Sequence, residues 1–517
     1  MDITITHWSA STAFPLLTTL MLVPLAATIA ILLSRSAAMA LRFGFAGALL
    51  TLLLSIYLLT VFDSTNPGIH LGEHFHFAGL SYRVGIDGTN ILFIPLTAVL
   101  TLLTLIYTLI TRHVTDKLFI ACLLSYETIL IGAFTALNVM QFWLWCVLEL
   151  VPVALLTIHA GTGQNRRWVV VLLLQYWVSG LLLTLAGFLL LAFGLIDASH
   201  PLTFDWLMLK QNNAYLHDEV LIFILLFFGF AIRMPLFPFH GWLPVLAEQG
   251  TVASAVVFLV GLKLGIYAAI RFILPMVPGV AEQWAEFVMV LGLISIFYGA
   301  LLALMQVNIR RLLAFAVISQ TGMLIIGAFC FNANGLEGTL LLSVAYGLAM
   351  AGMLFSVGLI YERTGTAFIP RLGGLFDTNG TLALLFLLSA LSTMVMPGTT
   401  GFDAAHLLVE GIIEEYGWLL AIAILVGNLM TAAFLLWAFQ RMFMAAPKRA
   451  AQPYSCAHHP VRTERVIAGI ICLLLIGTGF YTTPWLNFID QDAAAIGRQF
   501  PMHGAQMPTD IKDGEGE

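Results

Sequence analysis

Residues 221–273 read LIFILLFFGFAIRMPLFPFHGWLPVLAEQGTVASAVVFLVGLKLGIYAAIRFI. A first apolar run ends at Arg233, the chain breaks at Pro235, Pro238 and the turn at residues 240–244, and a second apolar run carries Lys263 at its centre. An ionisable side chain costs about 2.5–3.5 kcal/mol at the centre of a membrane helix, so it usually faces a bundle interior or a wet cavity and serves transport. The stretch therefore predicts a helix, a break and a second helix that form part of a transport site.

The rest of the chain is as apolar as this stretch. Of its 517 residues 60% are hydrophobic and only 10% are charged, whereas a soluble domain carries about 25% charged residues. The net charge of −6 gives no indication of a nucleic-acid partner, and the five cysteines include no CxxC pair. No P-loop or glycine-rich dinucleotide motif is present. We therefore expect a protein embedded in the lipid bilayer that binds no cofactor by itself.

Fourteen stretches are apolar and long enough to cross a bilayer, which takes about 20 residues. They lie at about residues 14–34, 40–62, 90–111, 117–136, 139–159, 168–194, 219–239, 251–274, 283–305, 313–331, 337–361, 379–415, 417–443 and 465–485. The predicted fold is an all-α polytopic membrane protein with about 14 transmembrane helices.

Lys and Arg are distributed unequally between the two sides of this topology. With the N-terminus outside, fifteen of the 22 fall in cytoplasmic loops and four in outer segments, and the other three lie in the hydrophobic stretch quoted above. Cytoplasmic loops are enriched in Lys and Arg. We therefore expect an integral protein of a bacterial inner membrane with both termini outside.

Helix breakers interrupt the seventh predicted span, at Pro235 and Pro238, and the twelfth, at residues 396–401. Transporters built from inverted repeats carry discontinuous helices at matching positions of their two halves. We predict two inverted five-helix repeats, at residues 117–275 and 283–443. Residues 1–116 precede them with an outer loop at 63–89, and residues 444–517 follow with a cytoplasmic loop, a last helix and a polar tail.

Three buried ionisable residues lie in the middle of predicted spans. Glu149 and Glu127 are each interpreted as a proton-path carboxylate or as a structural carboxyl bonded to a neighbouring helix. Lys263 is interpreted as a relay, because a lysine taken out of water gives up its proton more readily. Arg233 does not deprotonate, so it either tunes a carboxylate or extends towards the membrane surface. His240, at the helix break, is a relay member or a cap for freed backbone groups.

The second break is followed by Asp403, His406 and Glu410. Their spacings of three and four residues place them on one face of a helix. They predict a proton exit, with a solvated outer helix end as the alternative.

Two groups of possible metal ligands are interpreted as solvated loops: His70, His74 and His76 in the outer loop, and Cys456, His458 and His459 in a cytoplasmic loop. The tail after Trp485 is interpreted as an exposed or docked terminus without chemistry.

Several motifs give the chain a specific resemblance. It resembles the antiporter-like membrane subunits of respiratory complex I, the family of subunit M, over about residues 14–485. The motifs that carry the resemblance are Leu148-Glu149-Leu150-Val151-Pro152-Val153, Met234-Pro235, Pro238-Phe239-His240-Gly241-Trp242-Leu243-Pro244, Gly261-Leu262-Lys263, Gln306 to Leu312, Ile318 to Met323 and Met396-Pro397-Gly398-Thr399.

The resemblance implies fourteen helices, two inverted repeats and a proton path through the membrane, with NADH and quinone bound only by partner subunits. It also identifies departures. Val147 stands where the family has its first glutamate, and Arg233 stands where it has a lysine before Met-Pro. Gln320 replaces a common histidine, and Ala405 replaces the glutamate expected after the second break. Lys263 stands in its usual place.

Two functions follow as hypotheses. The first is a proton-translocating subunit of a complex I type NADH:quinone oxidoreductase or a close relative, with other membrane subunits as partners. The alternative is a recruited paralogue that supplies proton or cation flux to an inorganic-carbon uptake complex, with a zinc-dependent carbonic-anhydrase-like partner, or to an Mrp-type cation/proton antiporter. The altered residues motivate the alternative.

Overall fold

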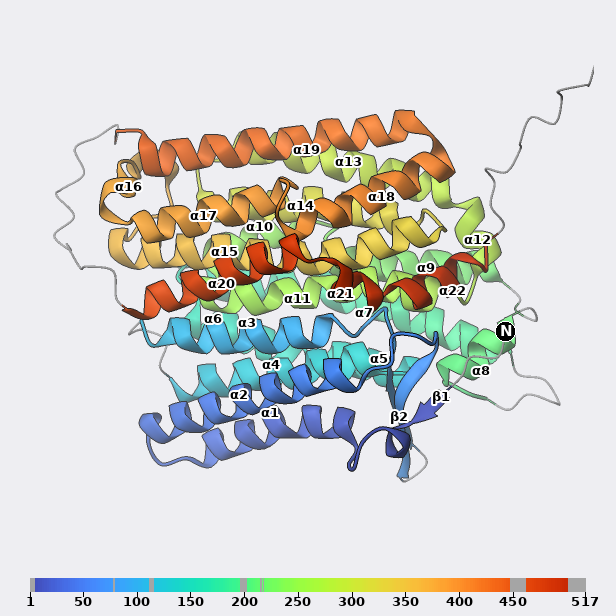
Figure 1. Ribbon diagram of the computed structural model, residues 1–517. Helices are drawn as coiled ribbons and strands as arrows, with labels where there is room; N and C mark the ends of the chain where they lie inside the picture. Colours follow the sequence, from blue (N-terminus) through green and yellow to red (C-terminus); the bar gives the residue numbers. More distant parts are fainter. Residues whose placement is uncertain are drawn as a thin grey trace, which may run out of the picture.

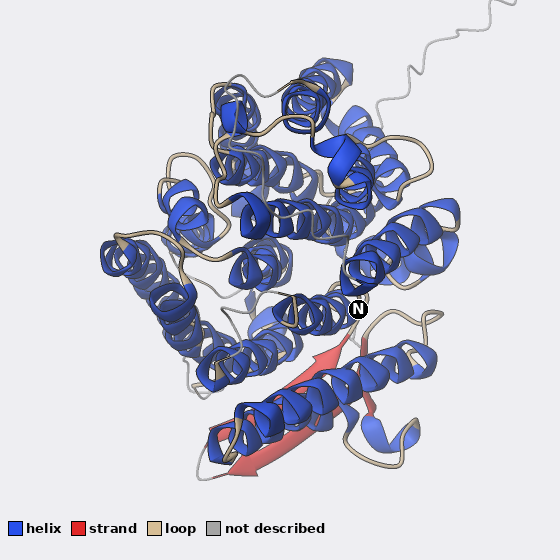
Figure 2. Cartoon of the chain, turned by 90° about the vertical axis from the view of Figure 1, so that its left-hand side faces the viewer, coloured by secondary structure: helices blue, strands red, loops and turns tan. Residues whose placement is uncertain are grey.

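The computed structural model describes residues 5–77, 80–110, 116–195, 202–213, 216, 218–446 and 462–500. It is a bundle of roughly parallel and antiparallel helices, with a three-stranded sheet at one end (Figure 1). Seen along the bundle, most helices stand close to end-on and the strands lie at one edge (Figure 2).

The elements up to the end of the first predicted repeat are β1 Ile5–His7, α1 Leu16–Leu33, α2 Ala37–Val61, β2 Ile69–Phe77, β3 Leu80–Ile86, α3 Phe93–Thr108, α4 Lys117–Thr135, α5 Val139–Leu148, α6 Leu150–Ala160, α7 Arg166–Gly194, α8 Trp206–Gln211, α9 Glu219–Arg233, α10 Trp242–Gln249, α11 Val252–Ala268 and the π-helical turn η3 Ala269–Ile273. The elements that follow are α12 Pro278–Gln283, α13 Ala285–Leu304, α14 Ile309–Ala328, α15 Ala333–Thr364, α16 Leu375–Thr378, α17 Gly380–Thr393, α18 Thr400–Tyr416, α19 Trp418–Phe439, the π-helical turn η5 Gln440–Met444, α20 Arg462–Phe480, α21 Thr483–Asn487 and α22 Asp490–Gly497.

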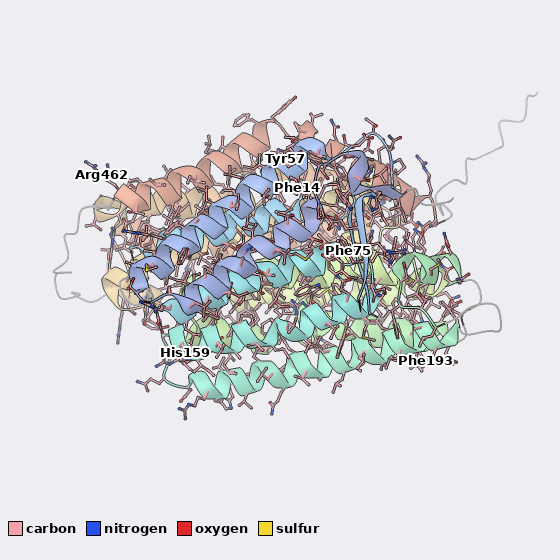
Figure 3. The ribbon with its side chains drawn as sticks, turned by 90° about the horizontal axis from the view of Figure 1, so that it is seen from below. Phe14, Tyr57, Phe75, His159, Phe193 and Arg462 are labelled. Carbon is pink, nitrogen blue, oxygen red and sulfur yellow. The ribbon has the colours of Figure 1, made fainter. Side chains whose placement is uncertain are left out.

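The all-α membrane fold is confirmed. Ten of the described helices are long and apolar enough to cross a bilayer, and α3 and α17 are shorter apolar helices. Large apolar side chains point outward, among them Leu182, Leu429 and Leu473 with exposed fractions of 60%, 70% and 72%, and Figure 3 shows Tyr57 and Phe193 on the outer surface. Lipid covers such a surface without cost. The total of fourteen crossings stays a prediction, because four predicted spans fall on helices that are short or broken.

The two predicted breaks are present and are built alike. After α9 ends, Leu236 N–H donates to Ala231 O at 3.0 Å, and after α17 ends, Met396 N–H donates to Leu391 O at 3.0 Å. Each break frees backbone carbonyl groups from the helical hydrogen-bond pattern, and within a membrane such groups must be hydrogen-bonded by other parts of the protein. Asn428 Nδ2 donates to the carbonyl of Met394 at 3.1 Å.

A second correspondence supports the two inverted repeats. Asn138 caps α5 and Asn308 caps α14, each through its side-chain oxygen. Leu137 and Val139 exchange backbone hydrogen bonds with Phe204 and Trp206 after α7, and the chain around Asn308 makes the same exchange after α15. The last helix of each repeat ends in a π-helical turn, η3 and η5. The residue bounds of the repeats remain a prediction.

The predicted outer loop contains the antiparallel hairpin of β2 and β3, and β1 pairs with β2. β1 and α22 lie at the same end of the bundle (Figure 1). We call this end the hairpin side. It also carries α8 and α12, whereas α16 and the connection between α1 and α2 lie on the opposite side.

Of the three hairpin histidines, the structure describes the side chains of His70 and His74. His70 is buried and its ring contacts Asn66 O at 2.9 Å and Thr6 Oγ1 at 3.3 Å, while His74 is exposed. The side chain of His76 and residues 456–459 lie outside the described part of the chain. Within that part, no group of three His, Cys, Asp or Glu residues has metal-binding geometry.

Candidate functional site

Glu149 lies at the junction of α5 and α6 and is completely buried. The hydroxyl of Tyr126 in α4 donates to Glu149 Oε1 at 2.7 Å. Gly261 in α11 makes this approach possible, since a Cβ there would stand 2.1 Å from the Tyr126 hydroxyl and 2.8 Å from Oε1. The three helices therefore meet around one carboxylate.

Arg233, the last residue of α9, forms an ion pair with Glu149 Oε2 and donates to the carbonyl of Gly261 at 3.2 Å. Its guanidinium lies 4.9 Å from the centre of the Trp177 ring. Its Nε has no hydrogen-bond partner among the described residues. Glu149 thus has a counter-charge that never dissociates a proton, and Arg233 points into the bundle rather than to the membrane surface.

The glycine at the centre of this cluster leads to a prediction. Gly261→Ala adds a methyl group against two buried polar atoms, so we expect a loss of about 1–3 kcal/mol in stability from overpacking. The thermal unfolding midpoint of the detergent-solubilised subunit measures it. The control is Gly477→Ala in α20, where an added Cβ meets nothing within 4 Å. Equal midpoints for the two variants would contradict the close contact of Gly261 with Tyr126 and Glu149.

Lys263 is also buried, with 4% of its surface exposed. It follows Gly261 by two residues, so at about 100° per residue it points to the opposite side of α11. Its ammonium lies 5.9 Å from the centre of the Tyr346 ring in α15. No described carboxylate forms an ion pair with it. One helix therefore separates the Glu149–Arg233 pair from an uncompensated ammonium group.

Tyr346 connects Lys263 to a small polar cavity in the second repeat. The cavity measures about 10 Å³, room for one water molecule. Ser319, Gln320, Tyr346 and Thr431 line it together with apolar side chains. Gln320 Nε2 has no partner among the described residues. The family carries a titratable histidine at this position. In this chain the side chain that faces the cavity there is Gln320, which does not titrate.

The other predicted site residues do not join this cluster. Glu127 is completely buried, and neither carboxyl oxygen has a hydrogen-bond partner among the described residues. His240 packs its ring against Tyr298 at 5.0 Å, and its Nδ1 is unpartnered among those residues. Trp242 Nε1 caps the freed carbonyl of Ile232 at 3.1 Å, so the ring of His240 is not the cap at that position. Among the described residues, neither Glu127 nor His240 forms a hydrogen bond, ion pair or ring contact with Lys263.

The predicted exit residues lie on the outer face of α18. His406 and Glu410 are exposed, and Asp403 accepts a hydrogen bond from Thr482. The buried face of this helix carries Ala404, Ala405 and Leu408. The structure therefore does not bring His406 or Glu410 to the buried cluster, and their exit role stays a prediction.

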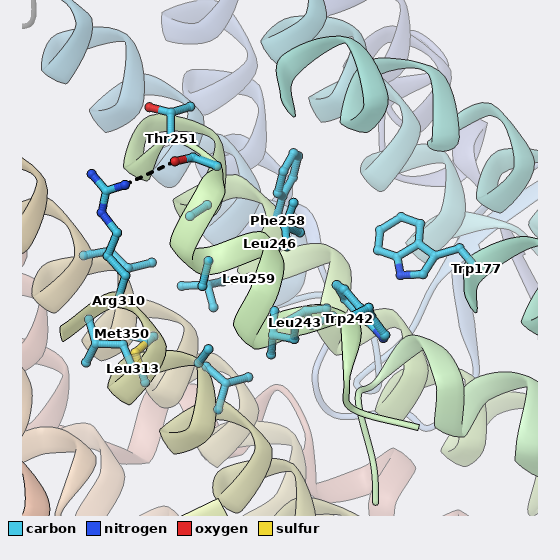
Figure 4. Close-up of a pocket in the computed structure, with 17 residues that line it drawn as sticks. Trp177, Trp242, Leu243, Leu246, Thr251, Phe258, Leu259, Arg310, Leu313 and Met350 are labelled. Carbon is cyan, nitrogen blue, oxygen red and sulfur yellow. Dashed lines mark hydrogen bonds between the residues drawn. The ribbon is translucent and has the colours of Figure 1, made fainter. Parts of the chain in front are cut away.

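A cavity of about 50 Å³ lies beside α11 (Figure 4). Arg310 stands at one end and donates to Thr162 Oγ1 at 2.7 Å and to the carbonyl of Gly250 at 3.3 Å. The other lining residues are mostly apolar, among them Trp177, Trp242, Leu246, Phe258, Leu259 and Met350. Such a lining holds no ion, so we do not place an ion-binding site here.

Sequence reasoning missed Tyr126 and Gly261 as partners of Glu149. Tyr126 directly precedes Glu127, and Gly261 begins the Gly-Leu-Lys motif. These positions were visible, but Tyr126 lies 23 residues before Glu149 and Gly261 lies 112 residues after it, and no local pattern indicates contacts over such separations.

Comparison with known proteins places these motifs in a family. The sequence model of "NADH:quinone oxidoreductase/Mrp antiporter, TM" matches residues 136–431. The NADH-quinone oxidoreductase subunit M of Rickettsia bellii is 33% identical over 369 residues, which are 71% of this chain and 74% of the relative. The F(420)H(2) dehydrogenase subunit M of Methanosarcina mazei is 30% identical and covers 93% of this chain and 98% of its own.

A solved structure agrees with both relatives. A chain of respiratory complex I from Thermus thermophilus superposes with a TM-score of 0.80 at 26% identity, over 93% of this chain and 99% of that chain. The matched segment of the family model exceeds half of this chain and contains Glu149, Arg233, Lys263 and both helix breaks. This chain therefore belongs to the NADH:quinone oxidoreductase/Mrp antiporter transmembrane family.

Proposed function

We propose that the chain is the antiporter-like, proton-translocating subunit of a complex I type membrane assembly. One observation carries the proposal: the buried ammonium of Lys263 has no carboxylate partner in the described part of the chain and lies one helix away from the Glu149–Arg233 pair. An uncompensated buried cation is costly and is retained in membrane proteins where charge is moved.

The pair and the lysine are coupled by electrostatics. When Glu149 takes up a proton, Arg233 loses its counter-charge and repels the ammonium of Lys263 across α11. Over about 10 Å, the diameter of a helix, and at an effective dielectric constant of about 20, two unit charges repel by about 1.7 kcal/mol. That is more than a tenfold change in the proton occupancy of Lys263. Protonation at Glu149 thereby drives a proton off Lys263.

Arg233 has a fixed part in this cycle. A lysine at that position could pass its own proton on, whereas arginine stays charged. Glu149 is therefore the group of the pair that takes up and releases protons, Arg233 sets its field, and Lys263 is the relay. Tyr126 positions the carboxylate through its hydrogen bond.

The partners follow from the relatives, which are named as subunits of quinone- or F(420)H(2)-linked redox enzymes. We place other membrane subunits beside this chain, with NADH and quinone handled by partner subunits, in a bacterial inner membrane. The distribution of Lys and Arg supports an orientation in which both termini and the hairpin side face outward.

The Mrp-type assembly is kept as the second candidate, because the family model spans both classes. The inorganic-carbon complex with a carbonic-anhydrase-like partner stays a prediction from the altered residues, and no feature of the described residues favours it.

Purification of the native complex tests the proposal. We expect mass spectrometry to find redox subunits with this chain, and the complex in proteoliposomes to acidify one compartment during quinone reduction. Antiporter subunits without a redox module would favour the second candidate. A redox complex that turns over without moving protons would refute the proposal.

A further inference from the structure

A cavity of about 460 Å³ lies on the hairpin side, next to the end of α11. We call it the vestibule. Its rim carries the exposed residues Thr6, Asn66 and Gln499, and its base carries the buried residues Asp87 and Arg271. The vestibule is open at the rim and charged at the base, and it can hold many water molecules, unlike the cavity of about 10 Å³ beside Tyr346.

Five charged residues from five segments line the vestibule: Asp63, Asp87, Lys210, Arg271 and Asp492. Arg271 forms an ion pair with Asp87, but its Nε and Nη2 have no hydrogen-bond partner among the described residues. A guanidinium group that is 3% exposed needs partners for such donors. Two donors of Arg271 at the base of the vestibule are thus left without a described partner.

Asp492 reaches the vestibule from α22 and accepts hydrogen bonds from the backbone N–H groups of Gly68 at 3.0 Å and Gly88 at 2.6 Å. Burial, and then the nearby Asp87 carboxylate, raise the pKa of Asp492 to about 7. Burial, and then Arg271, lower the pKa of Lys210 to about 8. The vestibule thus contains an acid and a base that exchange protons near neutral pH.

A polar route leads from Lys263 to this base. Lys263, Tyr267 and Arg271 follow each other at intervals of four residues, on one face of α11 and η3 over about 12 Å. The hydroxyl of Tyr267 donates to the carbonyl of Phe134 at 2.9 Å. Asn90 Nδ2 donates to the same carbonyl at 2.8 Å.

The last part of the route runs through Asn90, whose Oδ1 accepts from the backbone N–H of Asp87 at 2.9 Å. The carboxylate of Asp87 faces Arg271 and the vestibule. Two steps lack a described hydrogen bond: the helical turn from Lys263 to Tyr267, and the step from Asn90 to the carboxylate of Asp87, since Asn90 contacts the backbone N–H of Asp87.

The second repeat offers no comparable set of groups. Eleven residues after Asn138 stands Glu149, and eleven after Asn308 stands Ser319. Six residues before η3 stands Lys263, and six before η5 stands Phe434. At the second break, Thr393 takes the place of Arg233. The second repeat therefore conserves the backbone features of the first without its ionisable residues.

We propose that Lys263 exchanges protons with the hairpin-side solvent through the vestibule, with Asp492 as the terminal proton acceptor, and not through the second repeat. The inference rests on the proposed function. In the transfer, the Lys263 ammonium loses one proton on its Tyr267 side, water that enters from the vestibule carries this proton to the Asp492 carboxylate, and Asp492 then releases it to bulk solvent. Asp87 remains the ion-pair partner of Arg271.

Water access can be tested without any transport assay. Thr89 lines the vestibule and is 2% exposed, beside Asp87. We expect Thr89→Cys in the native complex to react with a membrane-impermeant maleimide added to the hairpin side. The control is Thr339→Cys in α15, which is completely buried and lines no cavity of the described residues. Failure of Thr89→Cys to react above the unsubstituted chain would overturn the inference and leave the proposed function standing.

The transport test uses Asp492→Asn in the assembled complex. We expect a loss of proton translocation of at least tenfold, with quinone reduction still measurable. In the unsubstituted complex, translocation toward the hairpin side should fall as the pH on that side drops through about 7, because a protonated Asp492 accepts nothing. Five other ionisable groups line the vestibule with Asp492 and influence the pH midpoint of this fall through their charges: Asp87, Arg271, Lys210, His70 and Asp63.

The matched control is Asp490→Asn, on the same helix but exposed and outside the lining of the vestibule. It should translocate protons at the normal rate. Normal proton translocation by Asp492→Asn would overturn the vestibule route. Loss of proton translocation in the single variant Glu410→Gln would also overturn it. Absence of translocation in the unsubstituted complex would instead refute the proposed function.

Discussion

Replacing Lys263 by Met is expected to stop proton translocation while the subunit stays folded and assembled. The ammonium is buried and has no carboxylate partner among the described residues, so its removal leaves no uncompensated charge. Met has a similar length and no charge to desolvate, and stability should stay equal or rise. Loss of a positioned proton-transfer group costs about 10²–10⁴-fold in rate, and proton uptake by reconstituted complex measures it.

Two further variants separate charge from proton exchange. Lys263→Arg keeps a cation that cannot become neutral, so translocation should be lost as it is with Met. Phe434→Leu, at the corresponding place of the second repeat, changes only packing and should translocate normally. If Lys263→Arg moved protons as fast as the unsubstituted chain, Lys263 would act only as a fixed charge and the relay would be wrong.

The sequence predicted the membrane fold, both helix breaks and the burial of Glu149, Arg233 and Lys263, for one physical reason. A charge within a run of about twenty apolar residues must face the inside of the bundle, whatever the helix packs against. Each of these three residues exposes at most 8% of its surface. Periodicity and composition were sufficient for this part.

Partner choice could not be predicted in the same way. Arg233 pairs with Glu149 across 84 residues, whereas Glu127, the other candidate carboxylate, has no described partner. The vestibule is still less accessible to sequence reasoning, since Gly68 and Asp492 are 424 residues apart. The tail after Trp485 was interpreted as lacking chemistry, yet α22 places a carboxylate in a cavity with four other charged residues. Such contacts depend on tertiary docking alone.

The residues after the second break illustrate a further limit. The spacing of Asp403, His406 and Glu410 correctly predicts a shared helix face, because α18 is helical there. Spacing does not say which face packs inward. In α18 the small and aliphatic residues take the buried side, and His406 and Glu410 face outward.

Glu149→Gln is expected to destabilise the subunit more than any other single change to the pair. It leaves Arg233 buried, charged and without a counter-charge, since arginine cannot discharge itself. Breaking a buried pair from one side costs about 3–5 kcal/mol. Arg233→Met should cost less, because Glu149 can take up a proton and become neutral while Tyr126 still donates to it. The thermal unfolding midpoint in detergent, with the fraction of assembled complex, gives the order of the two.

The double variant Glu149→Gln with Arg233→Met decides whether the two residues act as a unit. It removes both charges together, so it should regain most of the stability lost in Glu149→Gln, although proton translocation remains absent. The matched control is the Arg311–Glu248 pair, which is 3.3 Å apart and more than a third exposed on both sides. Glu248→Gln should cost at most about 1 kcal/mol, as exposed ion pairs do. Losses that simply add in the double variant would mean that Glu149 and Arg233 are not coupled, and Arg233 would then be unable to relay the protonation of Glu149 to Lys263.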